Sequence, residues 1–400
     1  MPSALYDWLT QGLSGFGWIQ ISVYFLIVTQ LTILSVTLYL HRSQAHRSVD
    51  FHPVLAHFFR FWTWLTTSMI TKEWVAIHRK HHAKCETEED PHSPQVVGIR
   101  KVMWQGVELY REARADRESI EKYGKGCPDD WIERHLYTPY ATVGPTLLLF
   151  ISIALFGVPG VAIWAIQSLW IPFWAAGIVN GVGHWWGYRN YETTDTATNL
   201  TPWGVWIGGE ELHNNHHAFP SSAKFALRKW EFDIGWAVIK GLQALGLAKV
   251  LRVAPSLDVR PNIPMPDGET LTALLTHRFQ AGTDYYRKVM LPTLREEAAR
   301  KAGDWVKLPR KLRKGLADNG RWLDSDARER LNAWVHARPK IATVVEYRAR
   351  LAAVLEQRSQ DATTTLAGLR QWCAEAEASG VRALEEFSAR LKGYAVVAAH

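Results

Sequence analysis

The chain has 400 residues, of which 47% are hydrophobic and 21% are charged, and this composition excludes an intrinsically disordered protein. Its 46 basic and 39 acidic residues leave a net charge of +7, and no nucleic-acid-binding motif accompanies this excess, so we expect no nucleic-acid partner. Charge is segregated along the chain, because residues 136–183 contain no Asp, Glu, Lys or Arg whereas residues 268–400 are rich in them. We therefore predict an apolar, membrane-embedded part followed by a polar part.

The first apolar segment, residues 16–40, carries no charged side chain. As a helix it would be about 37 Å long, which is enough to cross a bilayer with some tilt. No signal-peptide pattern accompanies it, so we expect a retained membrane span, with a buried helix of a soluble protein as the alternative. Arg42 and Arg47 follow the segment and only Asp7 precedes it, which places its C-terminal end in the cytoplasm by the positive-inside rule.

The uncharged stretch 136–183 is long enough for two spans, and the turn sequence FGVPG at 156–160 divides it near the middle. We predict a helical hairpin with spans at 141–156 and 161–181. Basic residues flank the hairpin, Arg134 before it and Arg189 after it, so both of its ends are expected in the cytoplasm.

Two further apolar segments are predicted as interfacial helices that lie in the membrane plane. Residues 53–70 are aromatic and apolar but contain His57 and Arg60. If they crossed the membrane, the histidines on their two sides would face opposite compartments. Residues 232–250 have a similar amphipathic character.

A change in composition divides the chain after the last apolar segment. Residues 1–255 form the predicted membrane domain, residues 256–267 form a Pro-rich linker, and residues 268–400 form a helical cytosolic extension without an assigned role. We expect a chain that ends near residue 256 to keep its metal. A basic run in the extension is a candidate patch for a partner or for lipid headgroups, with a solvated surface as the alternative. It comprises Lys307, Arg310, Lys311, Arg313 and Lys314.

Nine of the sixteen histidines gather in four clusters, each beside the predicted cytoplasmic end of an apolar segment. In both HxxHH motifs the three imidazoles share one helical face. The first pair is spaced by five residues, so it can flank a metal only if the helix loosens there. Imidazole suits Zn, Fe, Cu or Ni, and this many ligands exceed the needs of one ion, so we predict two metals. The clusters are His41 and His46; His78, His81 and His82; His184; and His213, His216 and His217.

The motifs HRSQAH, HRKHH and HNNHH, in this order, resemble the three histidine boxes of the membrane fatty acid desaturases. HRSQAHRS, EEDPHSP and GGEELHNNHHAFP, together with His184, resemble the stearoyl-CoA (Δ9) branch, and the resemblance covers about residues 16–250. It implies an all-α fold, in which a helical membrane domain carries a cytosolic histidine-box cap, here followed by the C-terminal helical extension. It also implies an oxidoreductase of lipid metabolism in a bacterial inner membrane, with its active site on the cytoplasmic face.

The resemblance implies a centre of two iron ions that uses O₂ as co-substrate, with zinc as a substitute in purified protein. All nine histidines of the four clusters match the family's ligands, and Asn180 matches an asparagine that holds one iron through a water molecule. The other histidines of this region, His52, His57, His92 and His135, do not match ligands.

The same resemblance implies a membrane-lipid environment and an acyl-CoA or phospholipid-bound acyl chain as substrate. Acyl-CoA members from animals commonly have an Arg-Asp pair before the second box, whereas this chain has Ala76 and Ile77 there. The chain also lacks a flavin fingerprint, a GxGxxG motif after a strand and a cysteine set for an iron–sulfur cluster. We therefore expect a separate electron donor of the ferredoxin or flavoprotein-reductase type.

Three alternative functions stay open at this stage. A di-iron hydroxylase of alkanes or lipids would use similar histidine boxes. A membrane zinc transporter would also gather histidines, although it would need polar ligands within its spans. A metal-dependent membrane hydrolase would need no redox metal.

Several other residues are candidates for supporting roles. The acidic residues Glu86, Glu88, Glu89 and Asp90 are candidates to fix imidazole tautomers, with an exposed acidic loop as the alternative. The cysteines Cys85, Cys127 and Cys373 lie far apart, so a disulfide framework or a cysteine zinc site is not predicted. Four tryptophans are candidates for the lining of an acyl tunnel, with lipid-facing aromatics as the alternative. They are Trp185, Trp186, Trp203 and Trp206.

Overall fold

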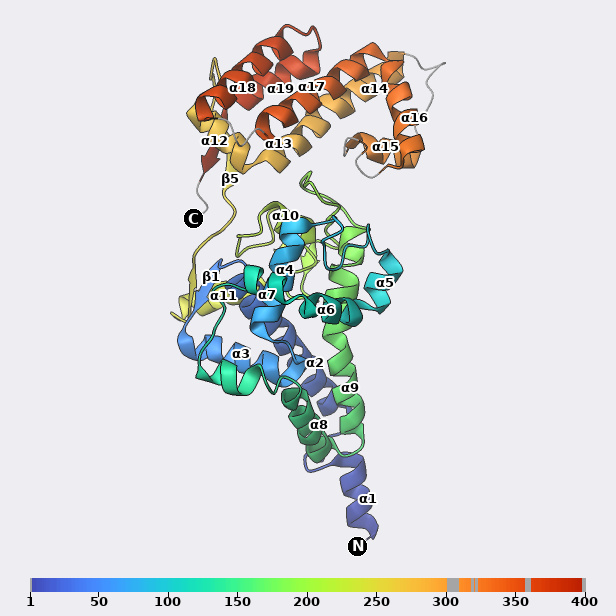
Figure 1. Cartoon of the computed structure of the whole chain (residues 1–400), viewed down its shortest axis with the longest axis vertical. Helices are drawn as coiled ribbons and strands as arrows, with labels where there is room; N and C mark the ends of the chain where they lie inside the picture. The colour runs from blue at the N-terminus through green and yellow to red at the C-terminus, as the bar shows by residue number, and fades with distance from the viewer. Residues whose placement is uncertain (1, 301–308, 318–319, 321–322, 357–360, 398–400) are drawn as a thin grey trace. The chain divides into compact units, whose positions relative to one another are not determined.

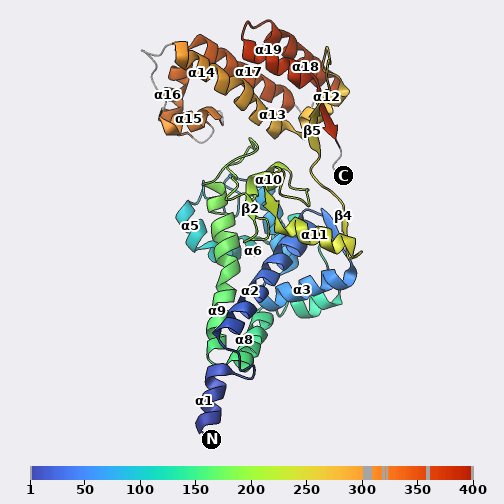
Figure 2. The ribbon, with the colours of Figure 1, turned by 180° about the vertical axis from the view of Figure 1, so that it is seen from behind.

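The computed structural model of the chain is mostly helical (Figures 1 and 2). It describes residues 2–300, 309–317, 320, 323–356 and 361–397. The chain divides into two units, which we describe separately. Unit 1 comprises Met1–Arg189 and Thr193–Ala254, and unit 2 comprises Asn190–Glu192 and Pro255–His400. The prediction of a helical protein is confirmed, although short strands, which we did not expect, form three two-stranded pairs in the described part of the chain.

Two long apolar helices form the elongated part of unit 1. In the first, α2 (Trp18–Ser35) continues into the π-helix η1 (Val36–Ala45). The second consists of α9 (Pro159–Ile171), the π-helix η3 (Pro172–Val179) and the 3₁₀ turn η4 (Val182–His184). By length and composition, Trp18–Ala45 and Pro159–His184 could each cross a membrane, and α8 (Val143–Phe156) is a shorter apolar helix.

Two glycines allow close backbone contacts at the two ends of α8. The turn between α8 and α9 lies at Gly157, where φ is +65°, and any Cβ there would also lie 2.4 Å from the Leu9 carbonyl oxygen of α1 (Pro2–Gln11). Gly144 lets α8 approach α3 (Pro53–Thr67), because a Cβ at this position would lie 2.2 Å from the Trp64 carbonyl oxygen. In both views α3 lies across the direction of α2 and α9 (Figures 1 and 2).

The rest of unit 1 consists of short helices and four short strands. Strand β1 (Val49–Phe51) pairs antiparallel with β4 (Ala248–Val250), and β2 (Trp203–Gly204) pairs parallel with β3 (Phe232–Asp233). Residues 232–250 therefore form β3, the helix α11 (Ile234–Ala244) and β4 rather than one continuous helix. The helices are α4 (Thr71–Lys84), α5 (Ile99–Trp104), α6 (Gly106–Ala115), α7 (Arg117–Tyr123), the π-helix η2 (Glu133–Tyr137), α10 (His213–Ala218) and α11 (Ile234–Ala244).

Unit 2 is a helical domain with its own apolar core. Tyr285, Trp372 and Phe387 meet at its centre, with ring centroids 5.1–6.4 Å apart. Its helices are α12 (Gly268–Thr276), α13 (Arg278–Tyr285), the π-helix η5 (Tyr286–Met290), α14 (Leu291–Arg300), α15 (Arg310–Ala317), α16 (Ser325–His336), α17 (Pro339–Glu356), α18 (Ala362–Glu377) and α19 (Arg382–Lys392).

Two segments outside the helices also belong to unit 2. Residues 256–267, which we expected as a linker, contain strand β5 (Ser256–Val259), which pairs antiparallel with β6 (Tyr394–Val397). The short segment Asn190–Glu192 is the other one. The Glu192 amide donates to the Thr283 hydroxyl at 3.0 Å, and the Glu192 carboxylate forms an ion pair with the buried Arg348.

Candidate metal centre

A π-helix explains how the first two histidines face one point. In an α-helix, residues five apart do not share a face, whereas a π-helix forms i→i+5 hydrogen bonds. The first histidine box lies in η1 and at its end, and the His46 amide donates to the His41 carbonyl at 3.1 Å. The helix is therefore wider here than an α-helix, as the five-residue spacing between His41 and His46 requires.

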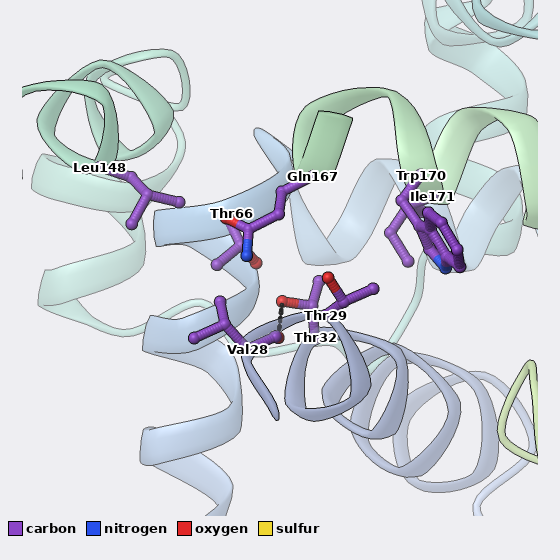
Figure 3. Close-up of a pocket in the computed structure, with 8 residues that line it drawn as sticks. All are labelled: Val28, Thr29, Thr32, Thr66, Leu148, Gln167, Trp170 and Ile171. Carbon is purple, nitrogen blue, oxygen red and sulfur yellow. Dashed lines mark hydrogen bonds between the residues drawn. The ribbon is translucent and has the colours of Figure 1, made fainter. Parts of the chain in front are cut away.

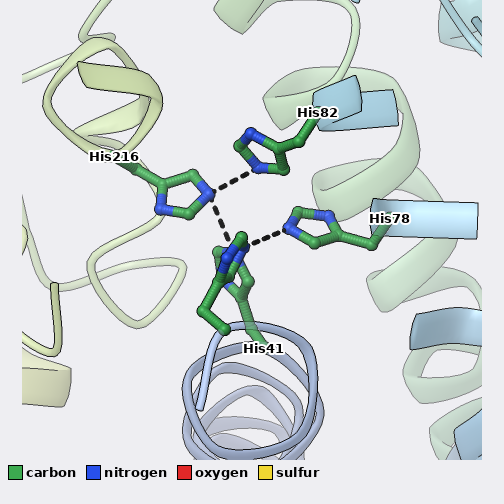
Figure 4. A group of neighbouring side chains, drawn as sticks. His41, His78, His82 and His216 are labelled. Atoms are coloured by element: carbon green, nitrogen blue, oxygen red, sulfur yellow. Dashed lines mark hydrogen bonds between the residues drawn. The ribbon is translucent and has the colours of Figure 1, made fainter. Parts of the chain in front are cut away.

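Five histidines from three separate helices form a first cluster (Figure 4). Their ligand nitrogens all lie within 4.8 Å of one another. The Nε2 atom of His216, on α10, lies 3.0 Å from that of His41 and 2.8 Å from that of His82. The cluster comprises His41, His46, His78, His82 and His216.

The remaining four box histidines form a second group that adjoins the first, since the ring centroids of His82 and His217 lie 4.4 Å apart. The ligand atoms of His81, His184 and His217 all lie within 4.8 Å of one another and of the Cys85 sulfur. His213 adjoins this second cluster, because its Nε2 lies 3.0 Å from that of His184 and its ring centroid lies 4.5 Å from that of His217. The structure thus brings all nine predicted histidines into two adjacent groups.

These two groups have a geometry into which metal ions fit. Two nitrogens bound at right angles to one metal, each at about 2.1 Å, are about 3 Å apart, which matches the Nε2 separations of 2.8–3.0 Å. The Nε2 atom of His217 is buried and has no hydrogen-bond partner in the described structure. Burial, reinforced by the neighbouring imidazoles, lowers the pKa of His78, His82, His216 and His217 well below the usual value, so these side chains are neutral as metal ligands must be.

Four carboxylates face the outer nitrogens of the cluster histidines. Each lies close to an Nδ1 atom and therefore directs the opposite nitrogen, Nε2, into the cluster. The pairs are Glu210 with His41 (2.6 Å), Asp90 with His81 (3.0 Å), Asp195 with His217 (3.0 Å) and Glu86 with His184 (3.2 Å).

Sequence reasoning found only part of this carboxylate set. Glu86 and Asp90 were among the four candidates of the acidic loop, whereas Glu88 is exposed and Glu89 pairs with Lys84 at 2.6 Å. Glu210 and Asp195 were missed. Neither lies at a helical spacing from the histidine that it faces, so no periodic signal could have indicated them.

A buried ion pair anchors the residue next to His41. The Arg42 guanidinium donates to the Asp233 carboxylate at 3.0 Å, and both side chains are fully buried. It also donates to the carbonyls of Ala223 and Gly208 and lies 3.9 Å above the ring centroid of Phe225. Asp233 is the N-cap of α11, so this contact connects the first histidine box to the start of that helix.

Asn180 and the histidines that did not match ligands have different surroundings. Asn180 is half-buried at the C-terminal end of η3, before His184. His92, which did not match a ligand, stacks on His81 with ring centroids 4.4 Å apart and forms a further group with His81 and Asp90. His57 and His135 contact Tyr137 and Trp131 instead.

The tryptophan and lysine–arginine candidates lie at the surface or outside the described part. The four tryptophan candidates are 50–68% exposed: Trp185, Trp186, Trp203 and Trp206. The ring centroid of Trp206 lies 6.3 Å from those of Trp170 and Trp174. Of the basic run, Lys307 lies outside the described residues. For its other four members the structure describes the backbone in α15, and their side chains lie outside the description. These four are Arg310, Lys311, Arg313 and Lys314.

A pocket between the apolar helices contains several polar groups (Figure 3). The Gln167 amide, the Thr29 hydroxyl and the Trp170 indole nitrogen are buried, and none has a hydrogen-bond partner in the described structure. The pocket is lined by Val28, Thr29, Thr32, Thr66, Leu148, Gln167, Trp170 and Ile171.

Comparison with known proteins places this site in a family context. A family model described as fatty acid desaturase matches residues 16–234. The sn-1 stearoyl-lipid 9-desaturase of Anabaena variabilis is 30% identical over 60% of this chain and 87% of the relative. Delta-9 acyl-lipid desaturase 1 of Arabidopsis thaliana is 31% identical over 60% of this chain and 77% of the relative. The sn-1 stearoyl-lipid 9-desaturase of Synechocystis sp. is 34% identical over 60% of this chain and 74% of the relative.

Proposed function

The chain belongs to the fatty acid desaturase family and is an acyl desaturase, and we propose that it forms a cis double bond at the Δ9 position of a lipid-bound acyl chain. The convergence of nine histidines into two adjacent groups carries this proposal, because it supports a centre of two metal ions. In this proposal one ion is held by His41, His46, His78, His82 and His216. The other is held by His81, His184, His213 and His217, with Asn180 acting through a water molecule.

Iron suits this nitrogen-rich set, and two bound iron ions would supply the O₂ chemistry that desaturation of an unactivated methylene requires. The side chains hold the centre ready for it. Glu210, Asp90, Asp195 and Glu86 each face the Nδ1 atom of one histidine, which fixes the ring orientation and directs Nε2 toward the centre. Six of the nine histidines are buried, which limits the access of bulk water to this part of the centre: His41, His81, His184, His213, His216 and His217.

A lipid-bound rather than CoA-bound substrate is supported by the second histidine box. Ala76 and Ile77 occupy the positions where acyl-CoA members commonly have a charged pair, and both are buried with Ile120 in a small apolar cluster. These positions therefore offer no charge to a CoA phosphate. The names of the relatives from Anabaena, Synechocystis and Arabidopsis point to the same substrate class.

We also propose a membrane arrangement for unit 1. Trp18–Ala45 and the α8–α9 hairpin would span a bacterial inner membrane, with the histidine groups at their cytoplasmic ends. Helix α3 lies across these helices (Figures 1 and 2), as a helix in the interfacial plane would. A separate electron donor of the ferredoxin or flavoprotein-reductase type would then dock on the cytoplasmic face.

Lipid analysis of cells that express the protein tests the proposed reaction. We expect gas chromatography to show new Δ9 monounsaturated chains, which isolated membranes should also form on stearoyl phospholipid when O₂ and a reductase system are supplied. A His82→Ala variant, which lacks one proposed ligand, should form none. Product on stearoyl-CoA alone, or a double bond at another carbon, would contradict the corresponding part of the proposal.

Labelling of introduced cysteines tests the topology. Positions near residues 43 and 83 should react from the cytoplasmic side only. Labelling of these two positions from opposite sides would separate the histidine boxes and refute the shared centre.

A further inference from the structure

The second histidine group contains a sulfur atom that the family resemblance does not account for. Cys85 is the C-cap of α4, one helical turn after His81, so its side chain returns to the same side of the helix. Its Sγ lies 3.9 Å from the Nε2 atom of His81. The chain has three cysteines, and all are free thiols.

The geometry around this sulfur is that of a metal site. The Sγ atom and one nitrogen from each of His81, His184 and His217 all lie within 4.8 Å of one another. In each of these imidazoles Nδ1 faces a carboxylate, so Nε2 is the nitrogen available to a metal. A sulfur at about 2.3 Å and a nitrogen at about 2.1 Å from one metal are about 3.1 Å apart at 90° and about 4.4 Å apart at 180°, and the observed 3.9 Å falls between these limits.

A second, independent feature indicates that a ligand belongs at this place. The Nε2 atom of His217 is buried and has no partner in the described structure, although its Nδ1 is held by Asp195 at 3.0 Å. A buried nitrogen without a partner is unfavourable unless a bound group satisfies it.

We propose, building on the proposed di-metal function, that Cys85 is a thiolate ligand of the metal held by His81, His184 and His217. On binding, the S–H bond breaks, the sulfur electron pair goes to the metal, and the proton leaves to solvent. The group with His41 and His216 has no such sulfur among the described residues. The two ions therefore differ in chemistry, one with nitrogen ligands and one with nitrogen and sulfur ligands.

X-ray absorption of the zinc-loaded, detergent-solubilised full chain tests this assignment without a turnover measurement. We expect a sulfur shell at about 2.3 Å beside the nitrogen shell at about 2.0–2.1 Å. Cys85→Ser should remove the sulfur shell and keep the nitrogen shell. Cys127→Ser is the matched control, because Cys127 is also a half-buried free thiol but belongs to none of the candidate metal groups, and it should keep both shells.

The outcomes separate this proposal from the proposed function. A nitrogen-only shell in the unaltered protein, or a sulfur shell that persists in Cys85→Ser, overturns the role of Cys85 and leaves the histidine centre standing. A protein that binds no zinc overturns both proposals. The spectrum of the unaltered chain decides the question even if Cys85→Ser does not fold, because the sulfur shell must be present before any substitution is made.

Discussion

Glu210→Gln tests whether the carboxylates behind the histidines tune the metal centre. The Glu210 Oε1 atom accepts hydrogen bonds from the Thr37 hydroxyl at 2.5 Å and from the His41 ring at 2.6 Å. Burial raises the pKa of Glu210, but the contact with His41, the nearby Arg42 charge and the hydrogen bond from Thr37 together lower it below the usual value, so the group is an anion at neutral pH. Glutamine has the same shape and keeps an acceptor oxygen, and the substitution therefore removes mainly the negative charge.

The expected effect is a 10–100-fold loss of metal affinity, the range found when a partner of a metal-binding histidine is altered. This corresponds to about 1.4–2.7 kcal/mol. Its origin is the hydrogen bond to a charged acceptor, which contributes about 1.5–3 kcal/mol compared with about 1 kcal/mol for a neutral one.

Competition between the apo-protein in detergent and a chromophoric chelator for Zn²⁺ measures this affinity. Glu88→Gln is the control, since it removes the same charge from an exposed position in the acidic loop. The reasoning would be refuted if Glu210→Gln bound zinc within about twofold of both the unaltered chain and the control.

Three further predictions concern the stability of the whole chain in detergent. Asp233→Asn leaves the buried Arg42 charge uncompensated and should lower the free energy of unfolding by about 3–5 kcal/mol, and a loss below about 1 kcal/mol in denaturant titration would contradict this. Gly144→Ala places a Cβ against the Trp64 carbonyl and should destabilise the protein by about 1–3 kcal/mol. Gly241→Ala is the control on an open face of α11 and should stabilise the protein by about 0.5–1 kcal/mol. Equal melting temperatures for the two variants would be inconsistent with this packing. Burial lowers the pKa of His277 to about 4. Between about pH 6.5 and pH 4 the unfolded chain therefore binds a proton at this histidine, whereas the folded chain does not. This difference lowers the free energy of unfolding by up to about 1.4 kcal/mol for each pH unit within that range. His277→Gln should therefore flatten the fall of melting temperature between pH 7 and pH 5, and an unchanged slope would show that His277 does not contribute.

The fold and the centre were predictable from the sequence to different extents. Family and helical character followed from the histidine boxes and the apolar segments, because both are local patterns. The contribution of Glu210 was not predictable, because its contact with His41 depends on the path of the chain between α9 and α10. Cys85 was overlooked for another reason: cysteine motifs are recognised by spacing to other cysteines, and this sulfur is instead surrounded by histidines.

The same limit applies to secondary structure. A π-helix and an α-helix have similar composition, so nothing in HRSQAH distinguishes the wider turn that aligns His41 with His46. Residues 232–250 have a helical hydrophobic pattern throughout, but their ends pair with strands far away in the sequence and only α11 is helical.

The membership of Asn190–Glu192 in unit 2 changes how the C-terminal extension can be removed or exchanged. The chain passes between the units at three peptide junctions, 189/190, 192/193 and 254/255, and a stop codon near residue 256 cuts only the last one. Such a truncation leaves Glu192 without Thr283 and Arg348, on the stretch of chain that connects His184 to Asp195. A single fusion after residue 254 would therefore not supply the whole of unit 2, because residues 190–192 also belong to it. Transfer of the extension to a relative would require residues 190–192 to be transplanted with it, so that Glu192 keeps its contacts with Thr283 and Arg348.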